Sequence, residues 1–295
     1  MTMGTLEILF IFMVQTQLGP QKVEVPAHSR LELQSEEDEL VFDTIELHEG
    51  SELSLPEFKS IHILNLIAKD GARISIANQS SGSDAESGVD GGNGAQVTFF
   101  VRHLAGNVVI EARGGDGSDG RDGRSGQQGT DGIKGQDAPH ISIPFFGFRL
   151  FNFFFGNGQR GQSGATGEDG ENGEDGGRGG DGGQVRVYYQ SKEEFSDIVV
   201  DVSAGQAGVG GRAGMGGLGG NGGIGGRGSS RGPQGFMGAN GKNGRPGRPG
   251  VPGTPGDVSI YQVDRKLYDC LLKFELVGGD PSDHQSEEWA QCVHS

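Results

Sequence analysis

The chain has 295 residues, of which 58 are glycine and 11 are proline, and its net charge is −16 at pH 7. An average protein contains about 7% glycine, so this composition excludes an ordinary globular core along the whole chain. The acidic balance argues against nucleic acid as a partner, because neutralising phosphates requires clustered Lys and Arg.

Residues 1–19 are predicted to be a signal peptide. Ile8 to Val14 form a short apolar run followed by polar residues, which is the length of a signal-peptide core and too short to span a bilayer. The run departs from the usual pattern because no Lys or Arg precedes it and Glu7 lies at its start. A secreted or cell-surface location is therefore predicted. No later segment is apolar enough to cross a bilayer, so no stable membrane span is expected.

Residues 20–80 are predicted to be an N-terminal β region. Short stretches in which apolar and polar residues alternate recur about every ten residues and are separated by breaks such as His48-Glu49-Gly50. They cover 23–25, 31–33, 40–47, 53–55, 61–67 and 74–76. Strands at this spacing indicate either a β-sandwich or the turns of a parallel β-solenoid.

Residues 81–263 repeat a pair of strands that is entered from a glycine-rich block. The equivalent positions Val97, Val185 and Val258 lie 88 and 73 residues apart. The glycine-rich blocks cover 82–94, 114–137, 158–183 and 205–256. We therefore interpret the blocks as insertions between successive strand pairs of one β scaffold.

Glycine falls at every third position through the three long blocks, with a single lapse at Ser229. Three residues per turn is the period of the polyproline II helix, and a residue without a side chain on one face lets another backbone approach. Because the ends of each block must return to adjacent strands, the blocks should fold back into legs, with a turn at 229–232. The predicted fold class is all-β, with glycine-rich polyproline-II (polyglycine-II) insertions packed as a bundle on the scaffold.

Two resemblances follow from the triplets at 167–175 and 244–256. They resemble those of collagen-like proteins of bacteria and viruses, which implies an extended homotrimer that is secreted or attached to a surface. The doubled glycines of 176–183 and 216–228 and the interposed strands depart from that pattern. They are more similar to monomeric polyglycine II bundles, as in glycine-rich phage tail adhesins and some antifreeze proteins, which implies packing within one chain.

A phenylalanine-rich segment lies between the first two long blocks. It contains Phe145, Phe146, Phe148, Phe151, Phe153, Phe154 and Phe155, seven of the chain's sixteen phenylalanines. One interpretation is a buried β-hairpin that fills the core. The other is an exposed aromatic patch at the tip of the bundle that binds a partner, a glycan or a membrane.

Two further sites are suggested by small groups of residues. Residues 114–119 match the first six positions of a calcium-binding nonapeptide, with Asp116 and Asp119 as ligands, but Arg121 stands where that repeat has a large apolar residue. Calcium is thus the one cofactor considered, and none is otherwise expected. Residues 264–295 are predicted to be a strand and a tail, in which Cys270 and Cys292 form a disulfide if the protein is exported.

Catalysis has little basis in the residues, because the seven histidines are scattered without metal-ligand spacing. The predicted function is a non-enzymatic, secreted or surface structural and adhesive protein that is monomeric and binds a surface ligand or glycan. The first alternative is a collagen-like trimeric stalk or fibre. The second is a glycan-acting enzyme on a β-solenoid.

Overall fold

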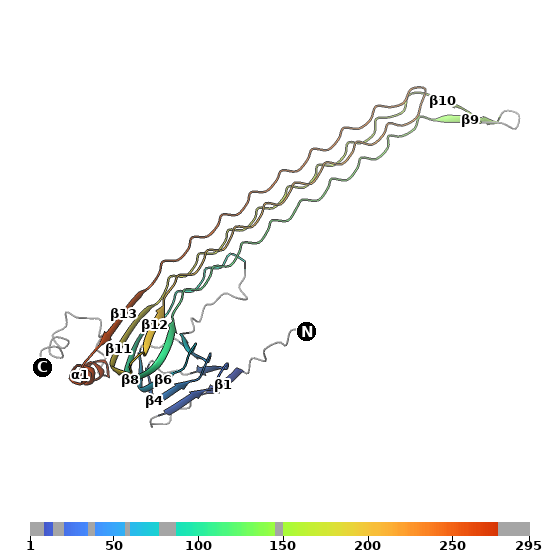
Figure 1. The fold of residues 1–295 in the computed structure, drawn as a ribbon. Helices are drawn as coiled ribbons and strands as arrows, with labels where there is room; N and C mark the ends of the chain where they lie inside the picture. Colours follow the sequence, from blue (N-terminus) through green and yellow to red (C-terminus); the bar gives the residue numbers. More distant parts are fainter. Residues whose placement is uncertain are drawn as a thin grey trace.

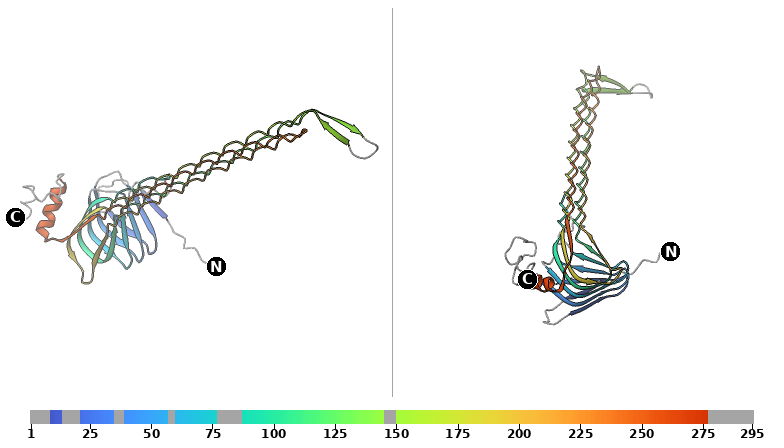
Figure 2. Two further views of the ribbon diagram at one scale, coloured as in Figure 1. Left: turned by 90° about the horizontal axis from the view of Figure 1, so that it is seen from above. Right: turned by 60° about the vertical axis from the view of Figure 1, so that its left-hand side comes forward.

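The computed structural model describes residues 9–13, 21–34, 39–56, 60–76, 87–144 and 150–276 (Figure 1). It consists of a β base, from which a long rod of glycine-rich segments projects. Figure 2 shows that the rod rises from one side of the base, next to the C-terminal helix, and that the N-terminal strands lie to the other side.

The β base is an eleven-stranded, parallel and nearly closed sheet. One ladder contains β1 (Leu9–Met13), β3 (Arg30–Gln34), β5 (Glu52–Leu55), β7 (Arg73–Ile76), the second half of β8 (Gln96–Glu111) and β12 (Asp197–Asp201). The other contains β2 (Gln21–Val25), β4 (Glu39–Leu47), β6 (Ser60–Ala68), the first half of β8, β11 (Gln184–Lys192) and β13 (Asp257–Gln262). The β character predicted from the sequence is confirmed.

Successive strands alternate between the two ladders, so the chain coils. Lys22 pairs with Thr44 and Thr44 with Asn65, so that each turn of the N-terminal coil takes 22 or 21 residues. Every pairing in this sheet is parallel, which is not the antiparallel sandwich considered from the sequence. Gly50 and Gly71 make the tight turns with φ of 61° and 74°, and a Cβ on Gly50 would collide with the His28 ring.

The alternating apolar residues of the strands point into the coil and form one core. Its fully buried members include Phe42, Ile45, Leu53, Ile63 and Phe99. Burial of such side chains contributes about 1.5–3 kcal/mol each, which compensates for the glycine-rich half of the chain, where few apolar side chains are buried.

The rod contains four glycine-rich segments: 114–137, 158–183, 205–228 and 232–256, called the first to fourth segments below. The first and third run outward from the base and the second and fourth return to it (Figure 1). The third and fourth are antiparallel, with Gly235 N–H donating to Gly223 O at 2.8 Å, and bends at 228–230 join them. The turn predicted there is confirmed. Residues 88–94 lie against the foot of the rod, where Gly91 N–H donates to Arg178 O.

The segments are held together by backbone hydrogen bonds between neighbours. The first segment donates to the third, as from Gly117 N–H to Gln206 O at 2.9 Å. The second donates to the fourth, as from Gly161 N–H to Pro233 O at 3.1 Å. At most rod glycines an added Cβ would lie within 3.0 Å of a neighbouring backbone atom, so the glycines mark the contact positions.

The strand predicted within residues 264–295 is wrong for the described part of that stretch, which forms the helix α1 (Arg265–Leu276). Asp264 caps its first turn, with Leu267 N–H donating to Asp264 Oδ1 at 2.8 Å. Tyr268 and Leu271, three residues apart, are buried against β8 and β11. The helical spacing was overlooked because the preceding strand pairs suggested a third copy. Among the described residues, no helix has the length and apolar character needed to cross a bilayer.

The apolar run predicted to be the core of a signal peptide contributes β1. Leu9–Met13 pairs in parallel with Arg30–Gln34 of β3 at one edge of the sheet. The signal peptide stays a prediction.

Candidate functional site

The phenylalanine-rich segment forms a hairpin at the far end of the rod (Figure 1). β9 (His140–Pro144) and β10 (Leu150–Phe154) pair antiparallel in a two-stranded sheet separate from the base. Phe154 is half-buried, with its ring 5.3 Å from that of His140, and Phe155 is 61% exposed. The hairpin therefore lies away from the core of the base, at the end of the rod that is farthest from it (Figure 1).

The other phenylalanines of this segment are placed less fully. Phe151 and Phe153 lie on β10, opposite Ile143 and Ile141 of β9. Phe145, Phe146 and Phe148 lie outside the described residues. The hairpin is thus separate from the sheet of the base and does not fill its core, which corrects one of the two interpretations of this segment. The exposed aromatic patch and its capacity to bind stay predictions.

Asp116 and Asp119, the predicted calcium ligands, have another role in the structure. Asp116 Oδ1 accepts the backbone N–H of Gln206 at 2.7 Å, and Asp119 Oδ1 accepts that of Val209 at 2.9 Å. Both residues belong to the first segment and both acceptors satisfy N–H groups of the third. These carboxylates cap a neighbouring segment, and a calcium site there stays a prediction.

The same capping recurs along the rod at the third position of the triplets. Between the first and third segments the bonded residues lie 90 apart, with Asp116, Asp119, Asp122, Ser125, Asp131 and Asp137 as acceptors. Between the second and fourth they lie 73 apart, with Asp169, Asn172, Asp175 and Asp181 as acceptors. Asp or Asn recurring at the third position of the triplets was a signal for this capping that sequence reasoning missed, because the partner residues lie 90 or 73 positions further along the chain.

Two of these carboxylates have perturbed pKa values. A hydrogen bond from Lys134, followed by the N–H of Arg227, holds the pKa of Asp137 below its usual value. The backbone N–H of Thr254 is the main cause of the lowered pKa of Asp181. Both groups are therefore held in their charged, accepting form.

The predicted disulfide lies at the C-terminal end. Cys270 belongs to α1 and is not a free thiol. Cys292 lies outside the described residues, and its pairing with Cys270 stays a prediction.

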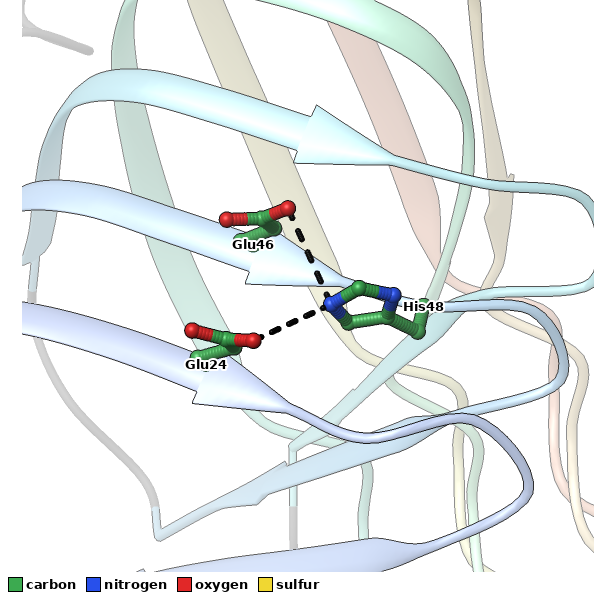
Figure 3. Close-up of side chains that lie close together, drawn as sticks. All are labelled: Glu24, Glu46 and His48. Carbon is green, nitrogen blue, oxygen red and sulfur yellow. Dashed lines mark hydrogen bonds and ion pairs between the residues drawn. The ribbon is translucent and has the colours of Figure 1, made fainter.

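Within the part of the chain that the structure describes, one group of side chains has the geometry to hold a cation: Glu24, Glu46 and His48 on the base (Figure 3). One ligand atom from each lies within 4.8 Å of the others. Glu24 and Glu46 are neighbours on the parallel strands β2 and β4, one turn of the coil apart, and His48 follows β4. Its Nε2 is 3.3 Å from Glu24 and 3.7 Å from Glu46. The 22-residue spacing of the two glutamates was a signal that sequence reasoning missed.

One lysine already pairs with both carboxylates of this group, and a second contacts the histidine. Lys22 Nζ lies 3.5 Å from Glu24 and 3.2 Å from Glu46, and its hydrogen bond to Glu46 raises the pKa of Lys22. Lys69 Nζ lies 3.3 Å from His48 Nδ1. Side-by-side glutamates would repel each other, so the arrangement is best explained as an ion network that joins adjacent turns of the coil.

An aromatic stack crosses the outer face of the second ladder and is capped by α1. His62, Phe100, Tyr188 and Tyr261 occupy matching positions on β6, β8, β11 and β13, and successive rings stack at 4.9, 5.3 and 5.4 Å. Burial lowers the pKa of His62 to about 4. The stack is packed against α1 through Tyr268, whose pKa burial raises to about 12. These rings join the four strands of the second ladder and pack α1 onto it.

Comparisons with known proteins identify no relative of this chain. No family model matches the chain, and neither the curated proteins nor the solved structures contain a match. Function must therefore be argued from the residues and their geometry.

Proposed function

We propose that this chain is a non-enzymatic structural and adhesive protein that is secreted or held at a cell surface. In this proposal the base is a β-solenoid, the rod is a bundle of polyglycine-II (polyproline-II) helices, and the hairpin at its tip contacts a surface ligand or glycan. The single observation that carries the proposal is the position of the hairpin at the far end of a long, hydrogen-bonded rod (Figure 1).

The bonding pattern of the rod supports the polyglycine-II assignment. Such helices have no internal hydrogen bonds and must satisfy their N–H and C=O groups through neighbours. The bonds run between segments and recur every three residues, as at Gly208, Gly211 and Gly214, which donate to the second segment. A rod bonded in this way resists bending because each segment is tied to two or more others.

The same pattern favours a rod completed within one chain over the collagen-like trimer. In a collagen triple helix the glycine positions of three chains meet at one axis. Here the space beside Gly167 is filled by the carbonyl group of Gly217, and that beside Gly220 by the carbonyl group of Thr130. Both neighbours belong to the same chain, so no second chain is needed to close the contacts.

A glycan-acting enzyme has one feature in its favour, the pair of carboxylates Glu24 and Glu46 on the base. Paired carboxylates carry out glycoside hydrolysis when one is a free acid and the other a free base or nucleophile. The ion pairs with Lys22 and His48 oppose that division of roles. Turnover of a polysaccharide panel that disappears in Glu46→Gln would reverse this conclusion.

The adhesive role is tested by substituting the described aromatic residues at the tip. The chain would be applied to a glycan array and to intact cell surfaces, and compared with the double variant Phe154→Ala, Phe155→Ala. We expect at least a tenfold loss of binding with an unchanged melting temperature. Phe195→Ala is the matched control, because Phe195 is 89% exposed on a turn of the base, far from the tip. An array and cells to which the unaltered chain does not bind would overturn the adhesive role.

A further inference from the structure

One side of the rod carries a row of exposed apolar side chains, all from the third segment. We call it the apolar row, and it consists of Val209, Met215, Leu218 and Ile224, which are 54–68% exposed. Each is the second residue of a Gly-x-y triplet, so the row follows one side of the segment. Arg212 and Asn221 occupy the two intervening positions and are also exposed.

Hydrogen bonds show that the apolar row faces away from the rest of the rod. Gly214 N–H donates to Glu171 O of the second segment at 2.9 Å. On one flank Asp122 of the first segment accepts the N–H of Arg212, and on the other Asn243 of the fourth segment accepts the N–H of Gly216. Three segments thus surround the third, and among the described residues the apolar row occupies its open side.

We propose that the apolar row binds the same row of a second copy of this chain, with the two rods antiparallel. A two-fold interface requires a surface that is complementary to itself, and this row meets the requirement. Val209 and Ile224 are equally distant from the midpoint between residues 216 and 217, and so are Met215 and Leu218. A two-fold axis through that midpoint, perpendicular to the rod, sets every apolar member of the row against an apolar member of the second copy.

Charged residues beside the row favour the antiparallel arrangement. The same axis brings Arg212 opposite Asp131 of the second copy, and Arg227 opposite Asp116. The position of each carboxylate along the rod is known because it accepts the N–H of a third-segment residue 90 positions further along the chain, Asp131 that of Asn221 and Asp116 that of Gln206. A parallel pair would instead set each arginine against its own counterpart, where like charges repel.

The proposal departs from the monomer that the sequence favours, and it does not depend on what the tip binds. Large exposed apolar surfaces of soluble proteins commonly mark interaction sites. The row runs from Val209 to Ile224, 16 residues, which is about 45 Å at a rise of about 3.1 Å per residue. The fourth segment also carries exposed apolar side chains, Phe236, Met237 and Val251, but three basic residues, Lys242, Arg245 and Arg248, interrupt them at the corresponding triplet positions.

The first test is the mass of the full chain in solution, by sedimentation equilibrium across the micromolar range. We expect a dimer that the double variant Met215→Glu, Leu218→Glu converts to a monomer. The matched control adds the same charge at exposed positions of the fourth segment that lie toward the second, Ala239→Glu and Val251→Glu, and should remain dimeric. Equal melting temperatures of the two variants show that both rods are folded.

The second test fixes the direction of the rods. Under oxidising conditions Val209→Cys with Ile224→Cys should form a covalent dimer, whereas Val209→Cys alone should not. Cross-linking of Val209→Cys alone would establish a parallel pair and overturn the arrangement. A monomer at all concentrations, a trimer, or a dimer that persists in the Met215→Glu, Leu218→Glu variant would each overturn the proposed interface.

Discussion

A single methyl group at Gly167 should open the rod in its middle. The Cβ of Gly167→Ala would lie 2.5 Å from the carbonyl carbon of Gly217 and closer still to its oxygen. Both atoms belong to backbone, so no side chain can rotate away. The second and third segments must therefore move apart by roughly 1 Å, because side-chain carbons do not approach closer than about 3.0 Å.

The expected cost follows from the hydrogen bonds at this level of the rod. Gly167 N–H donates to Ala239 O at 2.9 Å, Gly217 N–H to Glu168 O at 2.8 Å, and Glu168 N–H to Gln127 O at 2.9 Å. Loss or weakening of these bonds, at about 1 kcal/mol each, gives a destabilisation of about 2–3 kcal/mol. For a protein of this size that corresponds to a melting temperature roughly 5–10 °C lower.

Thr166→Ala is the control, because the neighbouring Thr166 is exposed and its side chain faces solvent. Thermal unfolding followed by circular dichroism compares the two variants, and hydrogen exchange of the rod amides shows where the structure opens. If Gly167→Ala and Thr166→Ala melt together and exchange alike, the glycine register does not define the packing of the rod.

Three other predictions concern the rod and the base. Deletion of Gln128 moves the following glycines of the first segment out of their contact positions, so limited proteolysis should cut the distal rod, whereas deletion of 126–128 keeps the register. Asp181 has a lowered pKa, mainly through the N–H of Thr254, so its contribution to stability is present above the ordinary carboxyl pKa and lost as pH falls through the lowered value. Asp181→Asn keeps the side-chain oxygen that accepts this N–H, so the melting temperature of the variant should fall less as the pH drops below the ordinary carboxyl pKa. Burial lowers the pKa of His62 from 6.5 to about 4, so the free energy of unfolding decreases as pH falls from 6.5 to about 4, by up to about 1.4 kcal/mol per pH unit. Chemical denaturation at a series of pH values measures this decrease, and His62→Phe should abolish it.

The β character of the base could be predicted from the sequence, because period-two alternation reports directly which residues face a core. Leu31, Leu33, Leu53 and Leu55 are all buried in the strands expected for them. The parallel pairing could not be deduced, since alternation is the same in a sandwich and in a coil. The direction of pairing depends on which strands become neighbours. Glu24 and Glu46 lie 22 residues apart because they occupy matching positions on adjacent turns, but this spacing can be interpreted only when the length of a turn is known.

The helix at the C-terminal end shows where local similarity misleads. The strand pair beginning at Asp257 resembles the earlier pairs, and this led us to expect a second strand after it. The spacing of Tyr268 and Leu271 and the capping residue Asp264 are helical signals in the same stretch. Local capping and helical spacing prevailed over the resemblance between repeats.

For the phenylalanine-rich segment the sequence offered two positions, the core and the tip of the bundle, and could not decide between them. The abundance of phenylalanine between 139 and 156 drew attention to this segment, yet its place at the tip depends on how far the first two segments extend before turning back. Asp116 and Asp119 were associated with calcium because a Gly- and Asp-rich motif has more than one use. Their capping role depends on a partner segment 90 residues away, which no local pattern reveals.

The base and the rod share one register, and this explains how such long glycine-rich excursions can be ordered. β11 pairs with β8 at an offset of 88 residues, β12 with β8 at 90, and β13 with β11 at 73. The same offsets recur in the rod, where Asp90 accepts from Arg178, Asp122 from Arg212 and Asp175 from Arg248. Because parallel strands lie about 4.8 Å apart, the base delivers each segment to the foot of the rod already beside its partner and in step with it. The entropy of closing each long loop is then offset triplet by triplet, since every triplet added to two adjacent segments extends the inter-segment hydrogen bonding. The β base therefore sets the register of the rod, and the apolar core of the base is the part of the fold on which the order of the glycine segments depends.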